Sequence, residues 1–553
     1  MALTQRLPPP VLMRSESPMP IRTENASSQK PAPIAAGRSA TLVAAGIFLS
    51  RIAGLIRERV FAHYFGNSDA ADVFRAAIRI PNFLQNLFGE GVLSASFIPV
   101  YARLRALGED EEASDVADAV ATLLALVTAV LVLLGVLATP YIIDAIAPGF
   151  HGAKRELTIR LVRIFFPGAG LLVMSAWCLG ILNSHRRFFL SYAAPIAWNA
   201  VMIATLIGFG RNHSEESLAV ITAWGSVVGS AMQLGVQLPV ALRLVRRLRV
   251  QLGLQLASVR EVIRNFFPVL ISRGVVQLSA YIDSIIASYL PTGAVAALGY
   301  AQILYTLPVS LFGMSVSAAE LPAMSGAIGS ESEVAAELRA RLGRALRQIA
   351  FLVVPSAVAF LALGDVVAAL IYQSGRFTHA NAIYVWGILA GSAVGLLASS
   401  LGRLYSSTYY ALRDPRTPLR FAVVRVALTT LLGLFCALRL PQMLGIDRSW
   451  GVAGLTASAG IAGWIEFLLL RWKLHQRIGA VAPASLFLAK LWISALVSAA
   501  GAWGIKLLVG HRHPIVVAIA VLIPYGVLYF AMTAGLRIPE AQSMLKRLSQ
   551  LAR

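Results

Sequence analysis

Charged residues are scarce in this sequence. They make up 14% of the 553 residues, whereas hydrophobic residues make up 57%. A soluble globular domain is typically about 25% charged and about 45–50% apolar. This shortage of charge, together with a mean hydropathy of +0.70, excludes an ordinary soluble domain. The composition instead predicts an all-α polytopic membrane protein.

Cysteine and catalytic motifs are scarce too. The two cysteines, Cys178 and Cys436, lie within apolar segments and are typical of small core residues rather than of a disulfide or a metal site. The eight histidines have no paired ligand spacing, and the sequence contains no Walker A motif and no nucleophile elbow. We therefore expect no enzyme activity, no metal and no cofactor.

Positive charge is the exception, because 48 Lys and Arg residues outnumber 27 Asp and Glu residues and give a net charge of +21. In a soluble protein this excess would suggest nucleic acid. In a membrane protein, basic loops that face the cytoplasm explain it. The sequence therefore predicts no nucleic-acid partner.

Residues 1–38 are rich in Pro and Ser and contain no long apolar run. A signal peptide needs such a run, so we interpret this stretch as a disordered cytoplasmic tail. After it, apolar segments recur at about the 20-residue length that spans a bilayer. We place about fourteen membrane-spanning helices, at about 40–65, 70–102, 117–138, 157–183, 190–210, 217–242, 262–290, 294–325, 345–363, 380–411, 418–440, 451–472, 484–509 and 514–536.

Loop charge predicts the orientation of these helices. If the N-terminus is cytoplasmic, the basic clusters fall on the inner side, at 185–187, 243–250, 339–347, 412–420 and 471–477. The loops on the outer side then contain few basic residues, namely Lys154, Arg155, Arg211, Arg376, Arg439, Arg448 and Arg512. By the positive-inside rule, we expect both termini in the cytoplasm.

A weak internal repeat predicts how the helices are grouped. The segment 88–95 resembles 312–319, and Pro195 and Pro418 follow at nearly the same offset. Duplicated lobes with broken helices are a transporter architecture. We assign two six-helix lobes to 39–250 and 251–478, two extra helices to 479–537 and a second cytoplasmic tail to 538–553. The expected bends are at Gly89, Gly91, Pro99, Gly313 and Pro322.

The first two predicted helices carry unusually many charges. They contain Arg51, Arg57, Glu58, Arg59, Asp72, Arg75, Arg79 and Glu90. An ionisable residue at the centre of a spanning helix costs roughly 2.5–3.5 kcal/mol, so such residues normally face a wet interior. We therefore expect these two helices to form the wall of a polar cavity.

Several motifs along the chain match one known family. They are SRIAGLIRERVFAHYFG at 50–66, DAADVFRAAIRIPNFLQNLFGEGVLSASFIPVYA at 69–102, APGF at 147–150, ILNSHRRFFLSYAAPIAWN at 181–199, YQSGRFT at 372–378 and YYALRDPRTPLRFA at 409–422. With these motifs, the stretch from about 40 to 480 resembles the MurJ/MviN family of lipid II flippases.

The resemblance implies a two-lobed exporter of the MOP superfamily in a bacterial inner membrane. Such a protein carries lipid II, the undecaprenyl-pyrophosphate-linked peptidoglycan precursor, from the inner to the outer leaflet by alternating access. The resemblance also implies that residues 484–536 help to form a groove for the lipid tail. The other expected partners are membrane lipids and cell-wall synthesis proteins, and we expect a monomer.

The sequence departs from the family pattern at cationic positions. The family commonly has a basic pair where this chain has Gln85 and Asn86, and an Asp-Arg pair where it has Gln302 and Ile303. Conversely, the predicted spans contain two arginines where the family usually has uncharged residues, namely Arg75 and Arg273. Either the positive charge is relocated within the cavity, which we favour, or the chain is a divergent paralogue with another cargo.

Five arginines are candidate ligands for the pyrophosphate: Arg51, Arg57, Arg75, Arg79 and Arg273. Guanidinium suits this task because it donates bidentately to phosphate oxygens and stays charged when desolvated. Arg57 has the alternatives of reaching the outer surface or pairing with a carboxylate to lock two helices. We interpret Arg59 as structural.

Five carboxylates are candidates for a gate or for ion pairs between the lobes: Glu58, Asp72, Glu90, Asp283 and Glu320. Asp72 and Glu90 are equally well explained as helix caps. Asp283 is expected to face a cavity arginine, with cation binding as the alternative. For Glu320 the alternative is a position on the inner surface.

The sequence thus predicts a lipid II flippase whose Arg-lined cavity binds the pyrophosphate. One alternative is a MOP-type exporter of a drug or of another lipid-linked saccharide. A cavity for cationic drugs should be acidic, and the arginine excess in the first two helices argues against it. The other alternative is a transport-inactive membrane scaffold for cell-wall synthesis.

Overall fold

The computed structural model describes the backbone of residues 33–245, 249–279, 281–326, 329–510 and 512–551. Side chains are described for the same residues apart from 33–44, 90, 271–279, 547–548 and 551. Every regular element within this described part is a helix, as the composition predicts.

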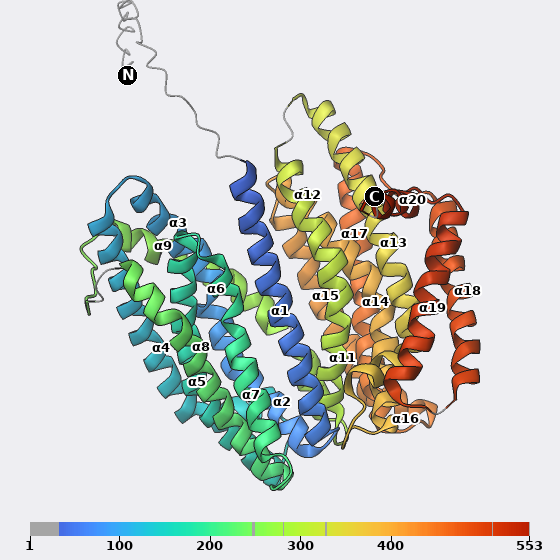
Figure 1. Ribbon diagram of the computed structural model, residues 1–553, viewed down its shortest axis with the longest axis horizontal. Coiled ribbons are helices and arrows are strands. Elements are labelled where there is room, and N and C mark those ends of the chain that lie inside the picture. The colour runs from blue at the N-terminus through green and yellow to red at the C-terminus, as the bar shows by residue number, and fades with distance from the viewer. Residues whose placement is uncertain (1–32, 246–248, 280, 327–328, 511, 552–553) are drawn as a thin grey trace, which may run out of the picture.

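The helices follow one another along the chain in two groups (Figure 1). The first half consists of α1 (Pro33–Phe65), α2 (Asp69–Phe88), α3 (Glu90–Ala106), α4 (Asp110–Ile146), α5 (Gly152–Ser184), α6 (Phe188–Ala193), α7 (Pro195–Phe209), α8 (Glu215–Val245) and α9 (Ala257–Ser279). The second half consists of α10 (Ile282–Ser288), α11 (Ala294–Pro308), η1 (Val309–Met314), α12 (Ser315–Ser325), α13 (Glu331–Tyr372), α14 (His379–Ala411), α15 (Arg416–Leu434), η2 (Phe435–Arg439), α16 (Leu440–Leu444), η3 (Arg448–Trp450) and α17 (Gly451–Ile478). Three further helices follow, namely α18 (Ser485–Val509), α19 (Pro514–Gly535) and α20 (Pro539–Leu551).

The two halves stand side by side, with α1 between them (Figure 1). Helix α1 contacts α6 and α7 of the first half and α13 of the second. Helix α9 lies in the stretch that the sequence assigns to the second lobe, yet it packs against α3 and α4. Arg103 on α3 makes an ion pair with Glu261 on α9 at 2.6 Å, and the rings of Phe88 and Phe266 lie 5.7 Å apart.

Eleven helices of the described part are long and apolar enough to cross a membrane. Each overlaps one predicted span, and the predicted spans at about 40–65, 70–102 and 262–290 have no counterpart among the eleven. The last two of these stretches are each divided into two helices, α2 with α3 and α9 with α10. The protein is therefore a multi-pass membrane protein, and the number fourteen stays a prediction.

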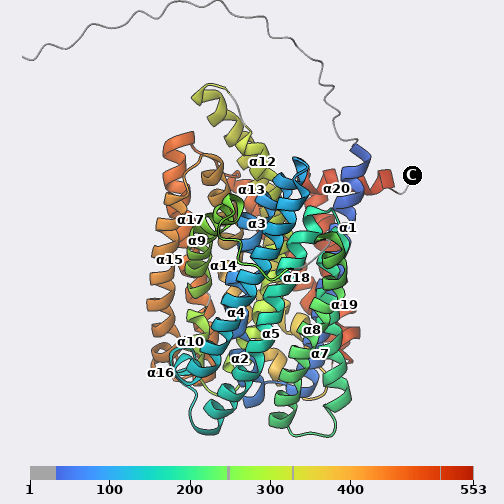
Figure 2. The ribbon, with the colours of Figure 1, turned by 90° about the vertical axis from the view of Figure 1, so that its left-hand side faces the viewer.

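Both predicted tails contain helix. Helix α1 begins at Pro33, inside the stretch predicted as a tail, and residues 1–32 lie outside the described part. Helix α20 occupies most of the C-terminal stretch and runs across the direction of the other helices (Figure 2). Its Glu540 receives a hydrogen bond of 3.1 Å from Arg347 on α13.

The helix irregularities fall at matching positions of the sequence repeat. Helix α2 ends and α3 begins at Gly89, where a Cβ atom would lie 2.2 Å from the carbonyl oxygen of Gln85. In the second half, Gly313 belongs to the π-helical segment η1, a form often found at functional sites. Bends were also predicted at Gly91, Pro99 and Pro322, but α3 and α12 continue through these residues.

The C-terminal helix pair is anchored on α13. Pro355 lies inside α13 and has no N–H, so the carbonyl oxygen of Phe351, one turn earlier, lacks its usual partner. The Tyr529 hydroxyl on α19 donates to that oxygen at 2.7 Å, and the Tyr525 hydroxyl donates to the Pro355 oxygen at 2.6 Å. Tyrosines of α19 thereby satisfy carbonyl groups beside a proline of the second half.

Tyr529→Phe should destabilise the protein by about 1–3 kcal/mol, because it leaves a buried carbonyl group without a donor. We expect a lower midpoint of thermal unfolding in detergent solution. Tyr141→Phe is the matched control, since the Tyr141 side chain is 79% exposed and its midpoint should not change. Equal midpoints for wild type and Tyr529→Phe would contradict this account.

Candidate functional site

A cavity of about 490 Å³ lies between the two halves. Its lining comes from α1, α2 and α7 of the first half and from α11 of the second half. The polar lining residues are Arg51, Arg57, Glu58, Arg75, Arg79, Asn82, Gln302 and Thr306. Arg51 is exposed, whereas Phe61 further along α1 is only 3% exposed, so the cavity deepens toward the end of α1.

Glu58 is the buried carboxylate of this cavity, with 4% of its surface exposed. It makes ion pairs with Arg57, the preceding residue, and with Arg75 on α2. An ionised carboxylate is stable in such a place only if it is paired and hydrogen-bonded. Both partners belong to the first half, so Glu58 joins α1 to α2 through Arg75 and makes no ion pair between the halves among the described residues.

Arg57 is also held by α7. Its Nη1 atom donates to Oδ1 of Asn199 at 3.0 Å, and its guanidinium carbon lies 4.7 Å from the ring centroid of Trp198. A guanidinium over an indole is a favourable cation–π contact. The Asn199 amide nitrogen donates in turn to the carbonyl oxygen of Pro195 at 3.0 Å, which fixes the amide's orientation.

Arg75 joins the two halves. Its guanidinium lies between the rings of Phe61 on α1 and Tyr300 on α11, each 4.8 Å away. The Tyr300 hydroxyl donates to the carbonyl oxygen of Gly66 at 2.9 Å, which is a second contact between the halves. The Nε atom of Arg75 is buried and has no hydrogen-bond partner among the described residues.

Arg51 and Arg79 differ from these two arginines because their partners are neutral. Arg51 donates to the Ser310 hydroxyl at 2.7 Å, and Arg79 donates to the Gln302 amide oxygen at 3.0 Å. Both acceptors belong to the second half. Within the described residues, neither arginine makes an ion pair with a carboxylate.

Some of the departures from the family pattern lie in the same cavity. Gln302 and Ile303 line it from α11, and Gln302 accepts a hydrogen bond from Arg79. The positive charge of the described lining therefore comes from α1 and α2 alone. Gln85 is not part of this lining, and Arg273 lies outside the described side chains.

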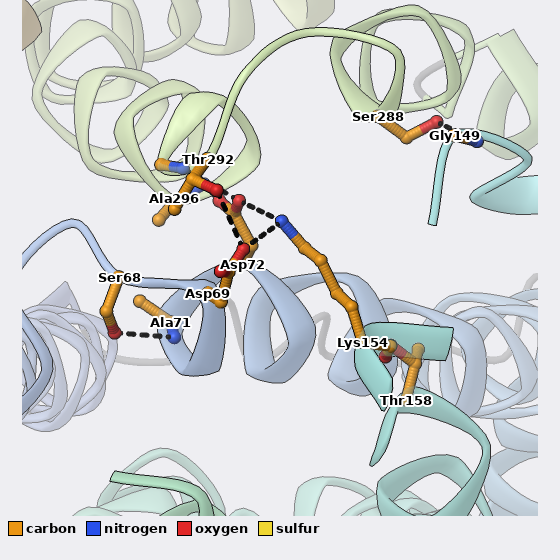
Figure 3. A network of polar contacts seen from close by, with 11 residues as sticks. Ser68, Asp69, Ala71, Asp72, Gly149, Lys154, Thr158, Ser288, Thr292 and Ala296 are labelled. Carbon is orange, nitrogen blue, oxygen red and sulfur yellow. Dashed lines mark hydrogen bonds and ion pairs between the residues drawn. The ribbon is translucent and has the colours of Figure 1, made fainter. Parts of the chain in front are cut away.

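The cavity is sealed at the end of the molecule at which α1 terminates. We call this end the closed end. There Asp72 on α2, 1% exposed, accepts hydrogen bonds from the backbone N–H groups of Gly293 at 2.8 Å and Ala296 at 2.7 Å (Figure 3). Lys154 on α5 donates to the same carboxylate at 2.7 Å. Asp72 therefore caps α11 of the opposite half, while its own helix is capped by Ser68.

The other carboxylate candidates behave differently. Glu320 lies 3.8 Å from Arg341, and both residues belong to the second half, so this pair does not bridge the halves. Asp283 makes no ion pair among the described residues, and its buried Oδ1 atom has no hydrogen-bond partner there. The side chain of Glu90 lies outside the described part.

Some residues of these networks were not singled out from the sequence. Asn199 and Trp198 lie in a motif that carries the family resemblance, and Lys154 follows another such motif. Arg59 was interpreted as structural, and its Nη1 atom donates to the carbonyl oxygens of Leu370 and Ile371 at 2.7 and 3.2 Å, at the end of α13. A cation near these last carbonyl groups stabilises the helix C-terminus.

Two helical halves around a central basic cavity define a membrane transporter. Residues 61–525 match the model of the family described as "Lipid II flippase MurJ". The lipid II flippase MurJ of Burkholderia cenocepacia is 31% identical over 450 residues, covering 80% of this chain and 84% of the relative. A probable lipid II flippase MurJ of Rhizobium tropici is 32% identical over 478 residues, covering 84% and 85%. The chain belongs to the MurJ family of lipid II flippases, a transporter family and not a class of enzymes.

Solved structures share the fold. A lipid II flippase MurJ in an inward closed conformation has a TM-score of 0.72 at 23% identity, covering 89% of this chain and 98% of the other. An inward-facing multidrug resistance MATE family transporter of the MOP superfamily has a TM-score of 0.60 at 16% identity, covering 78% and 96%. The chain therefore shares its fold with both of these transporters.

Glu58→Gln should destabilise the protein by about 3–5 kcal/mol, because it leaves two partly buried arginines without their counter-charge. The measurement is thermal unfolding of purified protein in detergent. Glu156→Gln removes the same charge from a side chain that is 73% exposed and should leave the midpoint unchanged. The ion-pair account fails if the two variants unfold at the same temperature.

Proposed function

We propose that this protein flips lipid II across a bacterial inner membrane by alternating access, with its pyrophosphate bound in the arginine-lined cavity. The observation that carries the proposal is the pair of cavity arginines with neutral partners, Arg51 and Arg79. Both termini would be cytoplasmic, so that the closed end faces outward and the cavity is reached from the inner side.

The charges of the cavity suit a polyanionic headgroup. Arg51, Arg57, Arg75 and Arg79 line it together with one described carboxylate, Glu58. Glu58 is committed to Arg57 and Arg75, so Arg51 and Arg79 are the groups best able to exchange a neutral acceptor for phosphate oxygens. Phosphate oxygens are negatively charged and can accept two parallel N–H bonds from one guanidinium, which favours that exchange.

The size of the cavity supports binding of a headgroup while the lipid tail stays outside. A volume of about 490 Å³ lies within the usual range of small-molecule sites, about 300–1,000 Å³. An apolar groove of about 520 Å³ runs along α19, lined by Gly526, Val527, Phe530, Ala531, Ala534 and Leu545. The α19 residues of this lining lie in the stretch 484–536 that the resemblance assigns to the tail, and Leu545 belongs to α20.

The alternatives are less well supported by the same features. A cavity for a cationic drug should offer carboxylates, yet here the described lining carries several arginines and one already paired glutamate. A scaffold that transports nothing has no use for arginines held at the surface of a cavity by neutral partners. Another undecaprenyl-linked saccharide would be bound through the same pyrophosphate.

Complementation tests the proposal. Wild type should restore growth to a bacterium depleted of its own lipid II flippase. Arg51→Ala and Arg79→Ala should each lower rescue by roughly tenfold or more, because a hydrogen bond to a charged group contributes about 1.5–3 kcal/mol. Arg448→Ala, at an exposed position outside the cavity, is the control for a lost positive charge and should rescue fully.

Immunoblots of membrane fractions must give equal amounts of all variants for this comparison. Rescue by both cavity variants at the wild-type level would contradict a role for the cavity arginines. Failure of well-expressed wild type to rescue would favour a different lipid-linked cargo or a scaffold.

A charge-restoration experiment tests whether the positive charge has been relocated. Ile303 lines the cavity beside Gln302, the hydrogen-bond partner of Arg79. Ile303→Arg should therefore recover rescue in the Arg79→Ala background, because it returns a cation to the same wall. Ile303→Met in that background is the size-matched control without charge. Equal rescue by both double variants would show that the cation at this wall is not what limits transport.

A further inference from the structure

The closed end contains a cation that sequence reasoning counted only as a loop charge. Lys154 donates to Asp72 and to Asp69, in each case at 2.7 Å (Figure 3). All three residues belong to the first half. From the second half, backbone N–H groups at the N-terminus of α11 donate to Asp72. The Thr292 hydroxyl, also of the second half, donates to Asp69 at 3.0 Å.

We propose that Lys154 keeps the closed end shut as the shared counter-ion that allows Asp69 and Asp72 to dock together on the N-terminus of α11. The inference rests on the proposed function in one respect, because it requires the halves to separate at this end during transport. It does not depend on which cargo is carried.

The positive end of α11 cannot hold two carboxylates without help. A helix N-terminus carries the equivalent of roughly half an elementary charge. Asp69 and Asp72 lie three residues apart on α2, a spacing at which like charges repel each other. Lys154 contacts one oxygen of each, so it removes the repulsion and completes the neutralisation of Asp72.

The contribution of Lys154 differs between a closed and a separated arrangement. When the halves part, Gly293 and Ala296 leave Asp72, whereas Lys154 stays beside both carboxylates on the same half. Water then reaches the pair, and a solvated ion pair contributes little. In the closed arrangement Asp72 is desolvated, and removing a partner from a desolvated charge is costly. Lys154 therefore favours closure.

Local contacts hold the ammonium group in position. The Nζ atom of Lys154 lies 4.4 Å from the ring centroid of Phe150. In the loop just before α5, the Gly149 N–H donates to the Ser288 hydroxyl of the second half at 3.2 Å. A Cβ atom at Gly149 would lie 2.0 Å from the Ser288 carbonyl oxygen, so the loop and the lysine approach the second half as one unit.

The experiment measures how often the closed end opens, without reference to cargo. A single cysteine at Thr306, which lines the cavity, is introduced after Cys178 and Cys436 are replaced by alanine. Intact cells or spheroplasts are treated from outside with a membrane-impermeant maleimide. Because opening is rare, the labelling rate reports the population of the outward-open form. A cysteine at Met443, 72% exposed in α16, is the positive control, because α16 lies at the end of the molecule at which α1 terminates (Figure 1).

Lys154→Met should raise the labelling rate at position 306 about tenfold, which corresponds to about 1.4 kcal/mol. Lys154→Arg should label at the wild-type rate because it keeps the charge. Arg155→Met is the matched control, since Arg155 pairs with Asp144 of the same half at 2.7 Å, and it should also label at the wild-type rate. A wild-type rate for Lys154→Met would overturn the inference.

Asp69→Asn tests the same idea without changing the lysine. In this variant Lys154 has Asp72 as its one remaining carboxylate partner, so the labelling rate at position 306 should stay at the wild-type value. A faster rate would count against a shared counter-ion. Wild type labelled at position 306 as fast as at position 443 would contradict both the proposed orientation and the inference. Growth rescue is scored separately. An unchanged labelling rate for Lys154→Met, together with full rescue by wild type, would overturn the inference about Lys154 alone. The expected labelling rates without rescue by wild type would overturn only the proposed cargo.

Discussion

Desolvation of charge is the constraint on which this structure depends. An ionised side chain inside an apolar bundle is tolerated only with partners close at hand. Glu58 meets this condition with two arginines, and Asp72 meets it with a lysine and two backbone amides. Glu58 joins α1 to α2, and Asp72 joins α2 to α5 and to α11 of the opposite half. For Asp72, the same requirement that limits charge in the membrane therefore also positions the halves.

The two halves contribute to these networks unequally. In the described part, the first half supplies the charged side chains of the cavity and of the Asp72 network, while the second half supplies hydroxyl, amide and backbone groups to them. Neutral groups lose little when they are exposed to water, whereas a charge that leaves its partner must be resolvated. In these two networks the halves can therefore separate without stranding an ion on each, whereas the ion pair between Arg376 and Glu215 crosses the halves.

Much of the candidate site could be predicted from the sequence, because charge in an apolar segment is a strong signal. Arg51, Arg57, Glu58, Arg75 and Arg79 were identified in this way, and all five line one cavity. Lys154 could not be identified, since a lysine in a predicted outer loop looks like any other surface charge. Lys154 matters because the second half lies against Asp69 and Asp72, and no local sequence pattern indicates that the second half lies there.

The fold was predictable to a similar degree. Hydropathy located the helices and the repeat located the interruptions at Gly89 and Gly313. Neither hydropathy nor the repeat could indicate that α9 packs against α3 and α4, because apolar side chains fit a neighbour from either half equally well. Three of the predicted spans have no counterpart among the long apolar helices of the described part, and these stretches contain charged residues or are divided into two helices.

The glycines at the closed end determine how the halves meet. Backbone approaches backbone at Gly149 beside Ser288, at Gly66 beside Arg376 and at Gly293 beside Asn67, in each case too closely for a Cβ atom. At these three contacts the halves meet backbone to backbone rather than through interlocked large side chains. Parting these contacts needs no rotamer change, so the surfaces can separate and meet again in the same register. Resistance to opening at these contacts is then set by polar groups, which can be strengthened or weakened one residue at a time.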